Sequence, residues 1–196
     1  MGGSASEIQD LVVAHARQHF PGRRVDLLRW DEGGIVENIV DLGLVRIAGG
    51  QPGEPWVYMS AGASAEPMEE GFGVEFFLVT RDDDRAALKL LAMIAHLHAD
   101  PRYPLSLGQV LEIGHPWLPG ASCDHILVSL PGPFGDDFEW LSTPARTIRL
   151  VWLLPITRDE ADFARSQGFG PLQEKLGAAQ ADPTDPMRMS VLRHPG

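Results

Sequence analysis

The sequence has little cysteine and no long apolar run, and each shortage excludes a class of protein. Only one of the 196 residues is a cysteine, Cys123, so an internal disulfide framework is excluded. The longest apolar runs, such as 150–155, are far shorter than the roughly 20 residues that a membrane-spanning helix requires. No basic segment leading into an apolar one, the pattern of a secretory signal, stands near the first residue. We therefore expect a cytoplasmic protein that does not bind membranes.

The sequence also lacks the spacing patterns of common cofactor and metal sites. Neither Gly-x-Gly-x-x-Gly nor Gly-x4-Gly-Lys-Ser/Thr, the loops that hold nucleotide phosphates, occurs in the chain. His115, Cys123, Asp124 and His125 offer metal-ligating atoms, but their spacing matches no zinc motif. We expect a buried, structural role for Cys123, because a reactive thiolate needs an electropositive site and this chain is acidic. The sequence therefore predicts no metal, no cofactor and no catalytic residue.

Basic charge is scarce in one segment of the chain. The formal net charge is −11, and residues 31–84 hold twelve acidic residues against two arginines, a net charge of −10. Such a segment repels phosphate backbones, which argues against nucleic-acid binding, and attracts basic protein partners. The alternative is that the acidic residues only maintain solubility.

What is present is the composition of one globular domain, with 44% hydrophobic and 22% charged residues. Periodicity, capping residues and Gly/Pro breaks predict helices over 6–20, 85–99, 158–168 and 171–176, and strands over 24–30, 35–47, 54–60, 71–80, 110–113, 125–130 and 147–154. From residue 177 onward Ala, Pro, Asp and Met dominate, which predicts a flexible tail. The expected fold is an α+β sandwich, with helices packed on a mixed, largely antiparallel sheet.

The strand at 71–80 shows the clearest pattern. Phe72, Val74, Phe76 and Leu78 alternate along it, so they are expected on one buried face. Glu75 interrupts this otherwise apolar strand. It either faces solvent or accepts hydrogen bonds that fix a neighbouring loop, and we favour the second interpretation.

Several short motifs, in a fixed order, resemble the Suppressor of Fused-like family. An aromatic strand ending in Gly-x-Ser (56–64) is followed by Gly-Phe-Gly-x-Glu-Phe (71–76). The later motifs are Leu90–Ala95, Leu107–Leu111, His-x-Leu-Val-x-Leu-Pro at 125–131, Ile148–Trp152 and Pro-Ile-Thr-x-x-Glu-x-x-Phe-Ala at 155–164. The resemblance is to bacterial members and covers about 50–176. It implies one such domain over 1–176, followed by the tail at 177–196.

The resemblance implies a function, because this family is known for binding proteins and not for catalysis. Among bacterial members it implies an immunity role, in which the domain binds and neutralises a toxin delivered by neighbouring cells. Fourteen arginines against two lysines, with many Ala and Gly residues, are typical of a GC-rich bacterial genome and fit that setting. One alternative is an adaptor that holds an extended peptide against a sheet edge. A small enzyme of unknown chemistry is the other.

A basic partner, either a toxin domain or a peptide segment, is expected to bind the acidic segment and the aromatic side chains beside it. The predicted partner-binding residues are Trp56, Tyr58, Glu66, Glu69, Glu70 and Glu75. Trp56 and Tyr58 share one side of their strand, so they are expected to act together as anchors. The competing interpretation is that both rings belong to the core.

Overall fold

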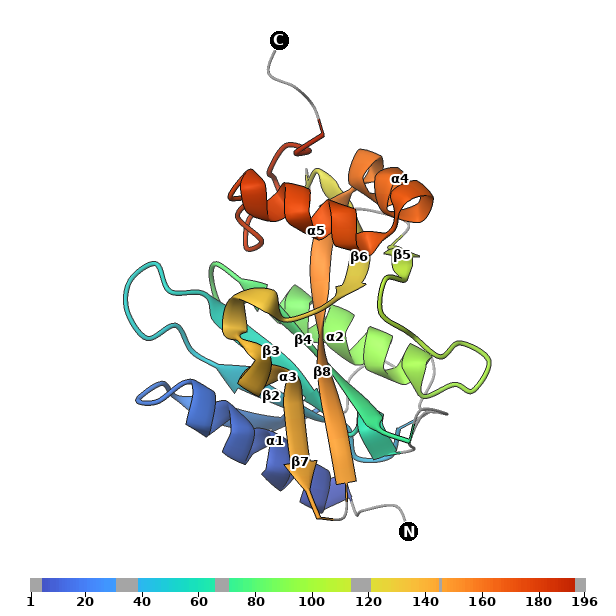
Figure 1. The fold of residues 1–196 in the computed structure, drawn as a ribbon. Coiled ribbons are helices and arrows are strands. Elements are labelled where there is room, and N and C mark those ends of the chain that lie inside the picture. The colour runs from blue at the N-terminus through green and yellow to red at the C-terminus, as the bar shows by residue number, and fades with distance from the viewer. Residues whose placement is uncertain (1–4, 31–38, 66–70, 114–120, 145, 193–196) are drawn as a thin grey trace. The chain divides into compact units, whose positions relative to one another are not determined.

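The computed structural model describes residues 5–30, 39–65, 71–113, 121–144 and 146–192. The chain divides into two compact units, each built from two stretches of sequence. The first unit comprises 1–104 and 130–151, and the second comprises 105–129 and 152–196. Figure 1 gives the labels of the helices and strands that are described below, one unit at a time.

Four strands of the first unit pair antiparallel in chain order, and β8 is the next strand after β4 in the sheet. They are β1 (Val25–Arg29), β2 (Gly43–Ile47), β3 (Trp56–Ala61) and β4 (Gly73–Thr80), followed by the first half of β8 (Arg146–Thr157). The short β7 (Trp140–Thr143) forms an antiparallel hairpin with the start of β8. The remaining elements of this unit are α1 (Ala5–His19), η1 (Ala63–Ala65), α2 (Arg85–His98), η2 (Gly132–Phe134) and α3 (Asp136–Glu139).

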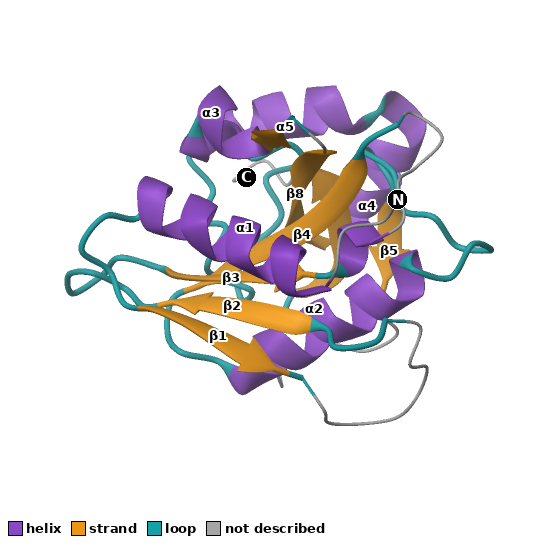
Figure 2. Ribbon diagram, turned by 90° about the horizontal axis from the view of Figure 1, so that it is seen from below, coloured by secondary structure: helices purple, strands orange, loops and turns teal. Residues whose placement is uncertain are grey.

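Both faces of β4 are covered in the first unit, so all eight of its residues are buried. Phe76 and Phe77 are consecutive and therefore point to opposite faces of the sheet. Phe76 contacts the ring of His98 in α2, whereas Phe77 contacts Phe134 and Phe138. Figure 2 shows α1 lying over β1, β2 and β3. The core of this unit therefore lies in two layers, one on each side of the strands.

The second unit is smaller and pairs β5 (Val110–Glu112), β6 (Cys123–Ser129) and the second half of β8 antiparallel. The register between β6 and β8 shifts between Cys123 and His125, which marks a bulge. Two helices, α4 (Arg158–Gln167) and α5 (Phe169–Ala178), follow β8 and pack against each other. The expected α+β fold, with a mixed and largely antiparallel sheet and packed helices, is confirmed.

The predicted starts of α2 and α4 are confirmed, whereas α1 begins at Ala5 and α5 at Phe169. Asp84 caps α2 by accepting from Ala86 N, and Thr157 forms a capping box with Glu160 at the start of α4. The strand predicted over 35–47 begins only at Gly43, and 35–38 lie outside the described residues. The acidic pair Asp136 and Asp137 opens the short helix α3, which is not among the helices predicted from the sequence.

The segment predicted to be a flexible tail contains ordered contacts in the structure. Residues 177 and 178 end α5, and Pro186, Arg188 and Val191 form hydrogen bonds with residues of β6, β8 and α4. Contacts of this kind fix a conformation but do not measure how often it opens. The flexibility of the tail therefore stays a prediction.

Two buried histidines of the first unit predict a loss of stability in mild acid. His15 donates from Nε2 to the carbonyl of Phe138 at 3.0 Å, and His98 packs on Phe76. Burial lowers the pKa of both from 6.5 to about 4, helped at His15 by the neighbouring His19. The unfolded chain therefore binds protons first, so stability is complete above pH 6.5 and falls as the pH drops towards 4.

Urea titrations at pH 7.5 and pH 5 should show this loss, roughly 1–2 kcal/mol for each histidine. The double variant His15→Gln, His98→Leu serves as the control, because it has neither buried imidazole. Its stability should change much less between the two pH values. Equal stability of the natural chain at both values would show that the two rings bind protons as readily in the folded chain as in the unfolded chain.

Candidate functional site

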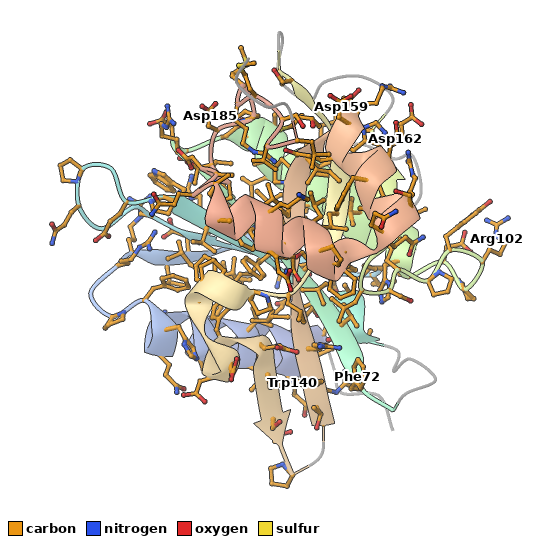
Figure 3. All side chains as sticks on the ribbon, turned by 45° about the horizontal axis from the view of Figure 1, so that its top comes forward. Phe72, Arg102, Trp140, Asp159, Asp162 and Asp185 are labelled. Carbon is orange, nitrogen blue, oxygen red and sulfur yellow. The ribbon has the colours of Figure 1, made fainter. Side chains whose placement is uncertain are left out.

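An exposed tryptophan at the start of β7 is the centre of the candidate site. Trp140 follows α3 directly, and 38% of its surface is exposed although it is a large hydrophobic residue. The ring of Phe72 meets it edge to face, with centroids 5.4 Å apart. Figure 3 shows the two side chains side by side on the first unit. Phe72, Glu139, Trp140 and Arg149 together are called the aromatic patch below.

The hairpin of β7 and β8 holds the tryptophan ring in place. Arg149 is the register partner of Trp140, so both side chains lie on one face of the hairpin. Its guanidinium lies 5.0 Å from the centroid of the indole ring, a cation–π distance. The same guanidinium forms an ion pair with Glu139 at 2.6 Å. A ring held on two sides loses less conformational freedom when a partner covers it.

Glu75 fixes the turn that follows β3. The residue has no exposed surface, and its two carboxylate oxygens accept five hydrogen bonds. The donors are the hydroxyls of Ser60 and Ser64 and the backbone N–H groups of Gly62, Ala63 and Ser64. The interpretation that Glu75 accepts hydrogen bonds from a neighbouring loop is confirmed. Because the carboxylate is enclosed, it acts on a partner only through the turn that it holds.

The other side of this turn contacts the hairpin. Arg146, at the start of β8, donates from Nη1 to the carbonyl of Ser64 at 2.6 Å. A Cβ atom at Gly73 would lie 2.6 Å from the Cβ of Ser64, so only glycine allows this approach. The two described ends of the connector between β3 and β4, at 62–65 and 71–73, are therefore held together beside the aromatic patch.

Tyr58 is not the surface anchor that the sequence predicts. Its ring is fully buried, and its hydroxyl donates to Asp83 at 3.0 Å and accepts from the N–H of Asp84 at 2.7 Å. Burial raises the pKa of this hydroxyl to about 12. Tyr58 therefore belongs to the core, in line with the competing interpretation. Trp56 is half-buried, with the guanidinium of Arg46 5.8 Å from its ring centroid.

The acidic residues of 31–84 are also less available to a basic partner than the net charge of that segment suggests. Glu66, Glu69 and Glu70 lie outside the described residues. Among the described acids, Asp83 forms an ion pair with Arg46, and Glu54 accepts from two backbone N–H groups in its own loop. Both carboxylates are exposed but already have partners within the chain, which weakens the expectation that they attract a basic partner.

Sequence reasoning missed the pairing of Phe72 with Trp140. Phe72 was assigned to the buried face of the 71–80 strand, but β4 begins at Gly73 and Phe72 is half-buried before it. The only signal in the sequence for an exposed role of Phe72 is a large aromatic residue at a strand end, between Gly71 and Gly73. Nothing local indicates that its partner is Trp140, which arrives from a different part of the chain.

A small polar pocket lies within the second unit, with a volume of about 170 Å³. It is lined by Ser122, Asp124, Thr157, Arg158, Asp159, Met189 and Ser190. Asp124 accepts from Arg158 at 3.2 Å and lies 2.6 Å from Nδ1 of the buried His125. The carboxylate of Asp124 is therefore engaged by two neighbouring side chains. Cys123 is buried, and this burial raises the pKa of its thiol to about 11.

The predicted absence of a metal site concerns several of these residues. His115 lies outside the described residues, so its relation to Cys123, Asp124 and His125 stays open. Within the described ranges, no three His, Cys, Asp or Glu side chains gather closely enough to hold a metal ion. The helices in those same ranges include none that is long and apolar enough to cross a membrane.

Comparison with known proteins gives a consistent result. The family model for Suppressor of fused protein (SUFU) matches residues 40–189. The crystal structure of a SUFU homolog from Neisseria gonorrhoeae superposes with a TM-score of 0.82 and 28% identity, covering 96% of this chain and 99% of that chain. A search of curated proteins found no match.

Two more distant structures share the fold. The Sufu chain of a Sufu–Fu complex superposes with a TM-score of 0.69 and 14% identity, covering 94% of this chain and 92% of that chain. Drosophila Suppressor of Fused gives a TM-score of 0.68 and 16% identity, covering 92% of this chain but 50% of that chain. At these identities the likeness concerns the fold alone.

Proposed function

The chain belongs to the Suppressor of fused protein family, and from this premise we propose that it is a non-enzymatic protein-binding domain. The more specific proposal is an immunity role, in which the domain binds and neutralises a toxin that carries a basic surface. In the Sufu–Fu complex, Sufu is bound to a second protein, and a chain of that complex shares the fold of this chain. This likeness supports the general class of function.

The observation that carries the proposal is the aromatic patch. Tryptophan and arginine are the residue types that most often dominate binding energy at protein interfaces. Here Trp140 is exposed, while Phe72 and Arg149 hold its ring in one orientation. The turn at 62–64 beside it is fixed from within by Glu75. A partner would therefore meet a prearranged surface, which lowers the ordering cost of binding.

Co-expression with the product of the neighbouring gene tests the immunity role. If that gene encodes a toxin, the natural chain should protect the host cells and bind the toxin in a pull-down experiment. Trp140→Ala should weaken the affinity by about 2 kcal/mol or more, roughly 30-fold in Kd, and leave the melting temperature nearly unchanged.

Tyr103→Ala is the matched control for this experiment, because Tyr103 is also an exposed aromatic residue of the first unit, with 53% of its surface exposed. It should bind as the natural chain does. Equal affinity of both variants would remove the aromatic patch from the interface. Failure of the natural chain to protect cells from a neighbouring toxin would overturn the immunity role.

One observation favours the adaptor alternative. Among the described strands, β7 pairs only with β8, so its other edge has no strand partner there. An extended peptide could add to such an edge through backbone hydrogen bonds. The two functions predict different partners, since an adaptor binds a short linear segment and an immunity protein binds a folded toxin.

A further inference from the structure

Residues 182–192, called the strap below, follow α5 and contact other parts of the second unit. The carbonyl of Pro186 accepts hydrogen bonds from the N–H groups of Ser122 and Cys123, at 2.9 and 3.0 Å. Ser122 directly precedes β6 and Cys123 is its first residue, next to the shift in register between Cys123 and His125. The strap therefore satisfies backbone groups that the strand ladder leaves open.

One ion pair holds the middle of the strap. Arg188 donates from Nη1 and Nη2 to the two carboxylate oxygens of Glu160, at 2.7 and 2.8 Å, and from Nη2 to the carbonyl of Pro155 at 3.0 Å. The carboxylate of Glu160 also accepts from the N–H of Val191 at 3.0 Å. The Glu160 side chain is fully buried, and the Arg188 side chain is 8% exposed. Such a bidentate, enclosed pair is among the strongest polar contacts that a protein forms.

Apolar burial contributes little to this attachment. Ser190 is the only strap residue that is classed as buried, while Met187 and Met189 are 53% and 72% exposed. The turns at Asp182 and Asp185 are closed within the strap by their own side chains. Segments with few buried apolar contacts open at low cost relative to the unit that carries them. The closed position therefore depends on polar contacts, chiefly the ion pair of Arg188 with Glu160 and the hydrogen bonds to Pro186.

Two features of the second unit lie against the strap. The thiol of Cys123 has no exposed surface, and the N–H of the same residue donates to Pro186. Met189 and Ser190 form part of the wall of the small polar pocket. If the strap moved away, Glu160 would keep its place at the start of α4, because it is also fixed by the N–H of Thr157 at 2.9 Å. The vacated site would then present a carboxylate without its cation.

We propose that the strap is a releasable cover, and that the site it fills is an acceptor for the arginine of a basic protein segment. Arg188 occupies this acceptor within the chain, and a partner segment of the same chemistry can replace it when the strap opens. This inference rests on the proposed protein-binding function for the nature of the partner. The opening of the strap itself can be tested without any partner.

The first test measures labelling of Cys123 by N-ethylmaleimide in the full chain, in the native state and at rising urea concentrations. Cys123 is the only cysteine, so mass spectrometry reports this site alone. A releasable strap predicts labelling through a local opening, whose urea dependence is much weaker than that of global unfolding. Labelling that occurs only with the urea dependence of global unfolding would overturn the proposal.

Variants of the ion pair sharpen this test. Arg188→Gln should accelerate labelling by about tenfold or more, because the bidentate ion pair with Glu160 is lost. Arg165→Gln is the matched control, since Arg165 forms only an exposed pair with Asp162 on α4, and it should change the rate less than about twofold. Should Arg188→Gln fail to fold, Arg188→Lys replaces it, because it keeps the charge without the bidentate geometry.

The acceptor is tested with a synthetic peptide of residues 182–192, added to the full-length variant that lacks the ion pair. The peptide with arginine should slow the labelling of Cys123 in a saturable manner, and the same peptide with glutamine in that position should not. Equal protection by both peptides, or by neither, would overturn the acceptor. A failure of toxin protection with a positive peptide result would instead count against the immunity role alone.

Discussion

Replacing Glu75 with alanine should lower the free energy of unfolding by about 3–5 kcal/mol, one of the two largest losses expected for a single substitution in this protein. The carboxylate is fully buried and accepts five hydrogen bonds, three of them from backbone N–H groups. Alanine would leave these donors without an acceptor, and water cannot reach them without opening the turn after β3. Equilibrium unfolding in urea, followed by far-UV circular dichroism, measures the loss.

Glu54→Ala is the matched control for this prediction. Glu54 also accepts from two backbone N–H groups, those of Gly50 and Gln51, but it is exposed. Water can replace its carboxylate, so the loss should stay below about 1 kcal/mol. Similar losses for the two variants would show that the donors around Glu75 find other acceptors. In that case the turn would not depend on the carboxylate for its shape.

The role of Glu75 could be predicted in part. A single acid in an apolar strand must either reach water or find donors, and the resembling family carries an acid at this position. The donors themselves stand 11–15 residues away in the sequence, so the sequence did not identify them. The caps of α2 and α4 were predictable because each capping side chain and the backbone N–H group that donates to it stand within a few residues. Contacts between residues that are close in the sequence can be predicted from a single sequence.

The position of the exposed aromatic residues was not predictable, because it depends on what covers each face of the sheet. Alternation along β3 places Trp56 and Tyr58 on one side but cannot say whether that side meets a helix. The structure packs α2 against β3, so Tyr58 is buried. Trp140 is exposed instead, and its partners Phe72 and Arg149 come from other strands or their ends.

The strap illustrates the limit of reasoning from composition. Alanine, proline and aspartate after residue 177 are typical of a flexible tail. Arg188 forms an ion pair with the enclosed carboxylate of Glu160 on α4, and this contact helps to hold the segment in place. The pairing joins residues that are distant in the sequence, and neither Arg188 nor Glu160 is unusual in its own neighbourhood. Local composition therefore misses the attachment of this segment.

The second large effect is expected at Phe138, whose ring connects α1, α3 and β4. It has no exposed surface and lies with centroids 5.0–5.7 Å from the rings of His15, His19, Phe20, Phe77 and Phe134. Phe138→Ala would open a cavity at the centre of this cluster and should cost about 3–5 kcal/mol of unfolding free energy. The residue stands two positions before Trp140, so the same change should loosen the patch-bearing hairpin.

Phe163→Ala separates this effect from the loss of any aromatic ring. Phe163 is half-buried on α4 and contacts Lys175, so its removal should cost only about 1 kcal/mol in the same urea titration. A further readout follows from His15, whose pKa is low because it is buried beside Phe138. Water entering the cavity would ease protonation of His15, so the Phe138→Ala variant should lose less stability between pH 7.5 and 5 than the natural chain. An unchanged pH dependence, or a loss no larger than that of Phe163→Ala, would show that the cluster closes around the missing ring.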